Sequence, residues 1–231
     1  MYFDATYLIV LPALIFAMIA QIKVKSAFEE NSRFINRRGI TAYDAVREIL
    51  DANGLYNVMI EHVSGSLTDH YDPRSNVIRL SDTVYGSSSV AAIGVAAHEA
   101  GHAIQYAEGY APIKIRNAII PVTQLGSHLA VPLVLVGLLF SRSLGWLVTA
   151  GILLYTAVVF FQAVTLPVEF NASHRALQTL ESRSMLDTDE LKKAKSVLSA
   201  AAMTYVAAML SALLSLLRLL FIANSRNNRR R

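Results

Sequence analysis

The sequence predicts a mainly α-helical membrane protein, with about four transmembrane helices and a small α+β core in the cytosol. The composition points this way, because 54% of the 231 residues are hydrophobic and 16% are charged, against about 25% charged in typical soluble domains. Four apolar runs approach the roughly 20 residues that a helix needs to cross a bilayer. The net charge of +4 is modest and its basic residues lie beside the apolar runs, which favours a lipid bilayer over nucleic acid as partner.

The first apolar run, residues 5–22, is interpreted as transmembrane helix 1. No basic region precedes it and no convincing small-residue cleavage site follows it, so we expect a retained anchor and not a signal peptide. Several lysines and arginines come directly after it. The positive-inside rule therefore places the next segment, residues 23–117, in the cytosol.

Residues 23–117 carry the patterns of one short helix and several strands. The helix is expected at residues 41–54, because Thr41 suits an N-cap with Asp44 three residues later, and Gly54 suits the C-terminal end. Strands are expected in three stretches, residues 57–63, 67–71 and 77–80. The last stretch is either an edge strand that holds an extended peptide by main-chain hydrogen bonds or an ordinary sheet strand.

The most specific motif is His98-Glu99-Ala100-Gly101-His102, which reads H-E-x-x-H. The residues before it are mostly small and apolar, as in a buried helix, and serines 87–89 are candidates for the N-cap of that helix. Two histidines four apart share one face of a helix and can hold one zinc ion. Glu99 then lies beside the metal's open position, where it can take a proton from water. Gly101 lets another element approach closely. The alternative is a buried helix with three polar residues, but these are costly to bury without partners.

Residues 118–166 are expected to form a transmembrane hairpin, helices 2 and 3, because only Ser141-Arg142-Ser143 separates two apolar runs. Two spans return the chain to the membrane face that carries the H-E-x-x-H motif, so residues 167–196 are again placed in the cytosol. A helix that starts near Pro167 would carry Glu169 in its first turn.

A catalytic zinc usually has three protein ligands, and the chain has no cysteine to supply one. Glu169 is our candidate for the third metal ligand, because His-His-Glu is a known catalytic set. Alternatively, Glu169 only complements a helix N-terminus. The other histidines have alternative roles. His70 either stabilises an oxyanion or belongs to the loop structure, and His128 either packs between helices or is functional. His174 either stabilises an oxyanion or contacts lipid headgroups, and His62 is expected at an exposed strand position.

The fourth apolar run, residues 197–223, is expected to be transmembrane helix 4, followed by a basic tail at residues 224–231. Ser211, Ser215 and Arg218 interrupt this run, so the alternative is that it lies partly against the protein or in the membrane interface. Four spans put the tail outside the cell, against the positive-inside rule. Either this run does not cross the membrane, or the basic residues of the other segments outweigh those of the tail in setting the orientation. We favour the second interpretation.

Three blocks of the sequence carry a family resemblance: Leu67–Arg74, Val95–Gln105 and Leu166–Ser173. Together they resemble the YugP-type neutral zinc metallopeptidases of bacterial membranes, and the similarity extends over nearly the whole chain. The resemblance implies a zincin-like peptidase with zinc on the H-E-x-x-H histidines. More distantly, Glu169 matches the downstream glutamate ligand of the HtpX and CAAX prenyl protease type. That pattern has an acidic residue where this chain has Ser173, and the YugP pattern often has Asp in place of Asn171.

The first functional hypothesis is an integral-membrane zinc metalloendopeptidase of the gluzincin type. Its metal ligands would be His98, His102 and Glu169, and Glu99 would be the catalytic general base. Its substrates would be membrane-associated proteins or peptides, cleaved at the cytoplasmic face of a bacterial cell membrane.

The alternative hypothesis is a zinc-stabilised membrane scaffold or adaptor without turnover. Small residues such as Gly126 and Gly137, and the alanine-rich fourth run, would then pack against partner helices or against other copies of the chain. Metal coordination separates the two hypotheses. An open position favours the peptidase, and a fourth protein ligand such as His174 or His70 favours the scaffold.

Overall fold

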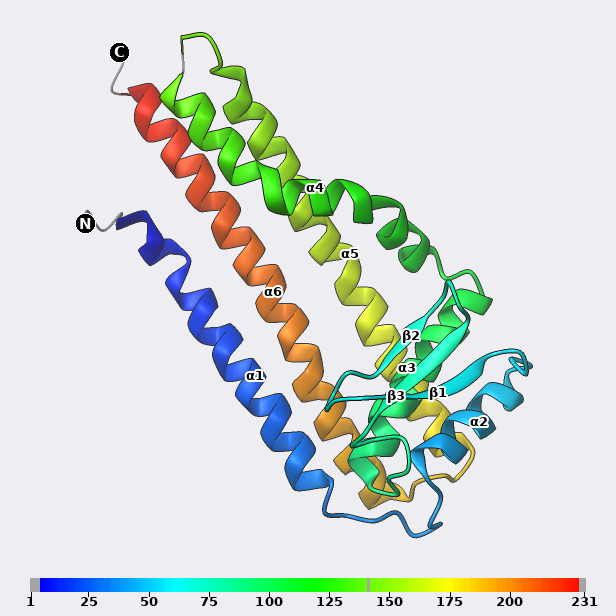
Figure 1. The fold of residues 1–231 in the computed structure, drawn as a ribbon. Helices are drawn as coiled ribbons and strands as arrows, with labels where there is room; N and C mark the ends of the chain where they lie inside the picture. The colour runs from blue at the N-terminus through cyan, green and yellow to red at the C-terminus, as the bar shows by residue number, and fades with distance from the viewer. Residues whose placement is uncertain (1–4, 141, 229–231) are drawn as a thin grey trace. The chain divides into compact units, whose positions relative to one another are not determined.

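The computed structural model describes residues 5–140 and 142–228, and helices predominate in it (Figure 1). The elements, in chain order, are the 3-10 helix η1 (Ala5–Ile9), α1 (Leu11–Asn31), α2 (Ala42–Ala52), β1 (Met59–Val63), β2 (His70–Asp72), β3 (Val77–Ser81), α3 (Val90–Ala107), α4 (Ala111–Leu139), α5 (Trp146–Ser182) and α6 (Thr188–Asn228). The expectations for Ser141 in the hairpin turn and for the last three arginines of the tail lie outside the described residues.

The chain divides into two compact units. The helical unit comprises Met1–Ile19, Lys114–Leu166 and Thr204–Arg231, as far as these are described. The core unit comprises Ala20–Ile113 and Pro167–Met203. The H-E-x-x-H motif and Glu169 both belong to the core unit, so their geometry is defined within one compact body.

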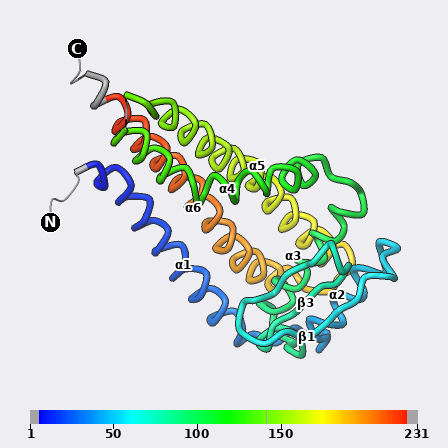
Figure 2. The backbone as a smooth tube through the Cα atoms, turned by 45° about the horizontal axis from the view of Figure 1, so that its top comes forward, coloured from blue at the N-terminus to red at the C-terminus, as the bar shows by residue number. Residues whose placement is uncertain are grey.

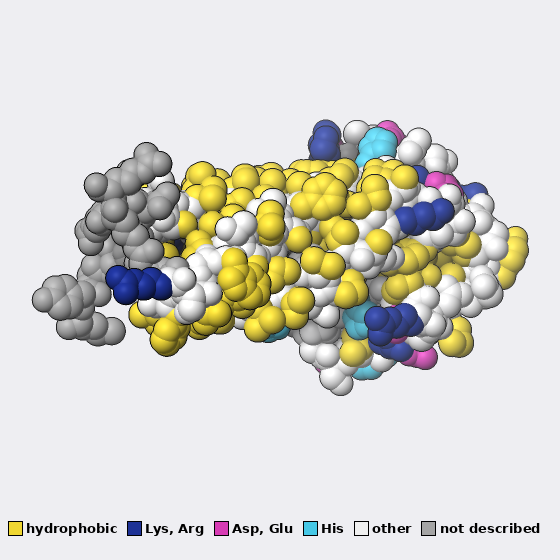
Figure 3. All heavy atoms as spheres, turned by 90° about the horizontal axis from the view of Figure 1, so that it is seen from above, with side chains coloured by type: hydrophobic (Ala, Val, Ile, Leu, Met, Phe, Trp, Pro, Cys, Tyr) yellow, Lys and Arg dark blue, Asp and Glu magenta, His cyan; other side chains and the backbone are white. Residues whose placement is uncertain are grey.

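Among the described residues, four helices are long and apolar enough to cross a membrane, namely α1, α4, α5 and α6 as far as Asn224. Only 11–22% of the apolar window of each helix is buried inside the protein. In the space-filling view, hydrophobic side chains accordingly cover the part of the helices that lies toward the two chain ends (Figure 3). Such an exposed apolar surface suits contact with lipid.

Helices α4 and α5 pack backbone to backbone in the helical unit. A Cβ added at Gly126 would lie 2.6 Å from the carbonyl oxygen of Leu154, and one at Gly137 would lie 2.7 Å from the amide nitrogen of Val148. The two glycines that the scaffold hypothesis assigned to partner helices therefore serve a contact within the chain. Helix α4 also contains two prolines and bends along its length (Figure 1), as helices do at internal prolines.

The core unit contains a three-stranded sheet with the order β1-β3-β2. Strand β3 pairs in parallel with β1 and antiparallel with β2. Residues 77–80 therefore lie in the central strand, and the expectation of an edge strand there is wrong, because both of its edges are already paired. The edge strand that contacts α3 is β2.

Strand β2 is also shorter than expected at its start. The prediction began the strand at residue 67, but β2 begins at His70. Leu67 has a φ of 56°, in the left-handed region, and Gly65 has a φ of 116°. Neither conformation continues a strand, so this stretch is a loop that leads into β2.

The two predicted helix starts in the core unit are confirmed. Thr41 is the N-cap of α2 and forms a capping box with Asp44. Ser89 is the N-cap of α3, where its hydroxyl accepts a hydrogen bond from the backbone N–H of Ala92. Each cap satisfies helix N–H groups that would otherwise lack a partner.

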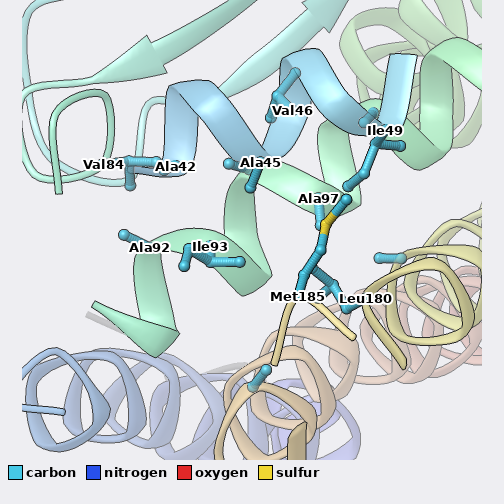
Figure 4. Close-up of a cluster of buried hydrophobic side chains, with 14 of the residues drawn as sticks. Ala42, Ala45, Val46, Ile49, Val84, Ala92, Ile93, Ala97, Leu180 and Met185 are labelled. Carbon is cyan, nitrogen blue, oxygen red and sulfur yellow. The ribbon is translucent and has the colours of Figure 1, made fainter. Parts of the chain in front are cut away.

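The hydrophobic core lies where α2 packs on α3. The buried stripe of α2, which includes Ala45 and Ile49, faces Ile93 and Ala97 of α3, and Met185 completes the cluster (Figure 4). In a second view of the backbone, the sheet lies beside α3 (Figure 2). Helix α3 is therefore held by α2 and by the sheet.

Helix α5 continues without a break through Pro167. The expectation that a new helix begins there, with Glu169 in its first turn, is wrong. Proline removes one backbone hydrogen bond, and a long apolar helix tolerates this loss because its other hydrogen bonds continue on both sides. Since Glu169 lies in the helix interior, it cannot act as a complement to a helix N-terminus.

Candidate metal centre

Two imidazoles of α3 and one carboxylate of α5 converge in the core unit. The Oε2 atom of Glu169 lies 3.3 Å from Nε2 of His98 and 3.3 Å from Nε2 of His102. The ligand atoms of these three residues all lie within 4.8 Å of one another. The structure thus brings together the three residues that the sequence analysis named as metal ligands.

The donor set fits a zinc ion. Zinc binds imidazole nitrogen and carboxylate oxygen at about 2.0–2.2 Å in a tetrahedral arrangement. Two ligands of such a tetrahedron are separated by about 3.3 Å, which equals the two nitrogen–oxygen separations at Glu169. Three protein donors leave one corner of a zinc tetrahedron for another ligand.

The convergence depends on a close crossing of α3 and α5. A Cβ added at Gly101 would lie 2.6 Å from the carbonyl oxygen of Ala172, so the two helices approach without an intervening side chain. Gly101 lies next to His102 on α3, and Ala172 lies three residues after Glu169 on α5. The expectation that Gly101 admits a closely packed element is confirmed.

Each histidine has a neutral partner at its other ring nitrogen. Nδ1 of His98 lies 3.0 Å from the hydroxyl of Ser173, and Nδ1 of His102 lies 3.0 Å from Oε1 of Gln105. Such a partner fixes the ring orientation, and a proton on Nδ1 leaves Nε2 available for a metal. Ser173 occupies the position where the related pattern has an acidic residue, so a hydroxyl replaces a carboxylate there.

The orientation of the Gln105 amide follows from its other contacts. Its Nε2 donates to the carbonyl oxygen of Val168 at 2.8 Å and to Oδ1 of Asn171 at 2.9 Å. Oε1 is therefore the acceptor that faces His102, and Nδ1 of His102 carries the proton. No role was predicted for Gln105 from the sequence. Its position three residues after His102, on the same helix face, was the available signal.

Glu99 is buried and is held by the edge strand. Its Oε2 accepts a hydrogen bond from the backbone N–H of Tyr71 in β2 at 2.9 Å. This contact leaves the second carboxylate oxygen, Oε1, outside the hydrogen bond to the strand. This contact was not predicted from the sequence, because it depends on the order in which the strands pair.

The negative charges around α3 change the affinity of His102 for protons. Burial lowers the pKa of His102, but the Glu169 carboxylate and then Glu99 raise it by more, so that the pKa stands above its ordinary value. An environment that stabilises a positive charge at this imidazole is also suited to a cation beside it.

The other histidines do not join the metal cluster among the described residues. His62 is half-exposed and contacts Oδ1 of Asp82 at 2.6 Å, which agrees with the expected exposed strand position. Nδ1 of His70 lies 2.9 Å from the carbonyl oxygen of Thr68. His174 and His128 have exposed side chains.

Comparison with known proteins identifies the family. Residues 6–224 match the family described as "Putative neutral zinc metallopeptidase". This chain belongs to the neutral zinc metallopeptidase family. It is 49% identical over 203 residues to the "Putative membrane protease YugP" of Bacillus subtilis (strain 168), an alignment that covers 88% of this chain and 89% of the relative. No solved structure matches the chain. The resemblance to YugP-type metallopeptidases is therefore confirmed.

Proposed function

We propose that this metallopeptidase is an integral-membrane zinc endopeptidase whose metal ligands are His98, His102 and Glu169. The observation that carries the proposal is the spacing of 3.3 Å between the Glu169 oxygen and each imidazole nitrogen. When bound there, zinc supplies Lewis acidity toward water and toward the substrate carbonyl. Three protein ligands leave the fourth position open, as in catalytic zinc sites.

Glu99 is the general base in this proposal. It lies on α3 between the two histidines, and its Oε2 is fixed by the N–H of Tyr71. Its Oε1 can take a proton from the attacking water and pass it to the leaving amine. The contact with Tyr71 holds the carboxylate in one place throughout this transfer.

The substrate main chain is proposed to lie along β2. In zinc-peptidase cores of the zincin type, an edge strand beside the metal commonly holds an extended peptide through main-chain hydrogen bonds. Strand β2 is the sheet edge that contacts α3, and it carries the N–H group that holds Glu99. A peptide beside β2 would lie next to the base.

We further propose that the substrates are membrane-associated proteins or peptides and that the site faces the cytoplasm of a bacterial cell. Lysines and arginines follow the first apolar run, flank the second run and lie between the third and fourth runs. This distribution supports a cytoplasmic location of the core unit by the positive-inside rule.

No observation favours the scaffold hypothesis. Among the described residues, the metal cluster contains neither His70 nor His174 as a fourth protein ligand. Gly126 and Gly137 already pack against α5 of the same chain.

The test is the substitution Glu99→Gln in the full-length protein, with cleavage of a fluorogenic peptide library and bound zinc measured on the same preparation. We expect the rate of cleavage to fall by about 10²–10⁴-fold, the usual contribution of a general base. Bound zinc should be unchanged, because Glu99 is not a ligand. Glu181→Gln, an exposed glutamate of α5, is the matched control and should keep wild-type cleavage. An active Glu99→Gln enzyme would rule out this mechanism.

A further inference from the structure

We propose that Arg175 is a positioning residue that holds the metal ligand His102 through two neutral amides, Asn171 and Gln105. This inference rests on the proposed function, because it assigns a role at the same site. Arg175 lies on α5, one helical turn after Asn171, and does not belong to the metal cluster. It would act on the metal centre only through other side chains.

The hydrogen bonds form a continuous path from Arg175 to His102. Nε of Arg175 donates to Oδ1 of Asn171 at 2.7 Å. The same Oδ1 accepts from Nε2 of Gln105 at 2.9 Å, and Oε1 of Gln105 lies 3.0 Å from Nδ1 of His102. Every polar group in this path therefore has a defined donor or acceptor role.

Arg175 is itself fixed at its other end. Its terminal nitrogen lies 2.7 Å from Oε2 of Glu108, the C-cap residue of α3. This hydrogen bond keeps the pKa of Glu108 below its ordinary value, so the carboxylate is ionised at neutral pH. The guanidinium also lies 5.9 Å from the centre of the Tyr110 ring, within the range of a cation–π contact. Arg175 thus joins the end of α3 to α5.

The amide of Asn171 explains why a donor at Arg175 is needed. An asparagine side chain can rotate so that its NH₂ group and its oxygen exchange places. In the exchanged position, the NH₂ group would face the NH₂ group of Gln105 and their hydrogen bond would be lost. Arg175 is a donor only, so it requires the oxygen of Asn171 on its side. The charged donor therefore selects the amide orientation that Gln105 uses.

Burial makes this selection consequential. Gln105 has no solvent-exposed surface, so water cannot replace a partner that it loses. If the oxygen of Asn171 turns away, only the carbonyl oxygen of Val168 still accepts from Nε2 of Gln105, so one hydrogen bond instead of two holds Oε1 of Gln105 toward Nδ1 of His102. Loss of such an outer partner typically weakens metal binding about 10–100-fold.

An aspartate at position 171 would not need Arg175 for this purpose, because both of its oxygens are acceptors. The inference therefore predicts that the effect of removing Arg175 depends on the residue at 171. With Asn171 present, Arg175→Met should weaken zinc binding about 10–100-fold. In the Asn171→Asp background, the same substitution should change zinc binding by less than about threefold, a small part of that range.

The experiment measures zinc affinity by chelator competition for four full-length proteins: wild type, Arg175→Met, Asn171→Asp, and the double variant. Absorption spectra of the Co²⁺-loaded forms report on ligand geometry, and thermal unfolding without metal reports on folding. Arg183→Met, an exposed arginine in the turn directly after α5, is the matched control and should bind zinc as the wild type does. If Arg175→Met does not fold, Arg175→Gln replaces it, because a neutral amide both donates and accepts and so does not select the oxygen of Asn171; the same rescue by Asn171→Asp is expected.

The inference is overturned if Arg175→Met binds zinc as tightly as the wild type, or if it weakens binding equally in both backgrounds. A merely structural role would lower the unfolding temperature of the metal-free protein without rescue by Asn171→Asp. The outcomes separate this inference from the proposed function, since a wild-type protein that binds no zinc contradicts both. A wild type that binds zinc, with no effect of Arg175→Met, contradicts only this inference.

Discussion

Three ionisable side chains at the metal centre, Glu99, His98 and His102, each have an outer contact that limits their freedom. Glu99 is held by the backbone of β2, His98 by the hydroxyl of Ser173 and His102 by the amide of Gln105. Groups fixed before the reaction do not need to be ordered during it. Both histidines have neutral outer partners, which increase the basicity of an imidazole less than a carboxylate does.

At the residue scale, the sequence predicted the cluster better than its surroundings. Helical spacing places His98 and His102 on one face, and the return of the chain after two apolar runs brings Glu169 to them. The contacts with Gln105, Ser173 and Tyr71 were not predicted, because each depends on which helix face or strand edge meets another. Ser173 and Asn171 were noted only as departures from related patterns.

The crossing of α3 and α5 is the element-scale contact on which the site depends. We predict that Gly101→Ala weakens zinc binding and lowers stability by about 1–3 kcal/mol, the usual cost of overpacking. The new Cβ would lie 2.6 Å from the backbone oxygen of Ala172, so the helices must move apart. Zinc affinity and thermal unfolding are the measurements.

The matched control for this prediction is Gly86→Ala. A Cβ at Gly86 meets nothing within 4 Å, so this variant should bind zinc and unfold as the wild type does. A Gly101→Ala protein that keeps wild-type zinc affinity would show that the close crossing is not required.

At the element scale, the helix caps were predicted correctly, whereas the order of the strands and the role of Pro167 were not. Thr41 and Ser89 cap α2 and α3 as expected, because a cap is decided by residues within one turn. The position of β3 in the centre of the sheet was missed, because strand order depends on pairing between distant residues. Pro167 was interpreted as a helix start, but the surrounding helix absorbs the lost hydrogen bond.

At the scale of the whole molecule, cysteine labelling tests the proposed orientation in the membrane. The chain has no cysteine, so single cysteines can be labelled without background. We predict that Ser143→Cys, in the exposed turn between α4 and α5, reacts with a membrane-impermeant maleimide in intact cells. Ser64→Cys, on the surface of the core unit, should react only after permeabilisation. The opposite pattern would place the core unit outside the cytoplasm.

The composition and the four apolar runs were enough to predict a membrane protein, because span length and hydropathy are properties of continuous segments. They did not predict that α5 and α6 extend well beyond the apolar runs as single helices. Helix α5 carries both an apolar run and Glu169, so one element links the expected membrane span to the metal centre.

The most direct measurement is X-ray absorption at the zinc edge for the purified wild-type protein and for Glu169→Gln. The wild type should show two imidazole nitrogens and one carboxylate oxygen at about 2.0–2.2 Å, with one further oxygen from solvent. Glu169→Gln should lose the carboxylate and most of the bound zinc. An unchanged spectrum in Glu169→Gln, or a fourth protein ligand in the wild type, would contradict the proposed centre.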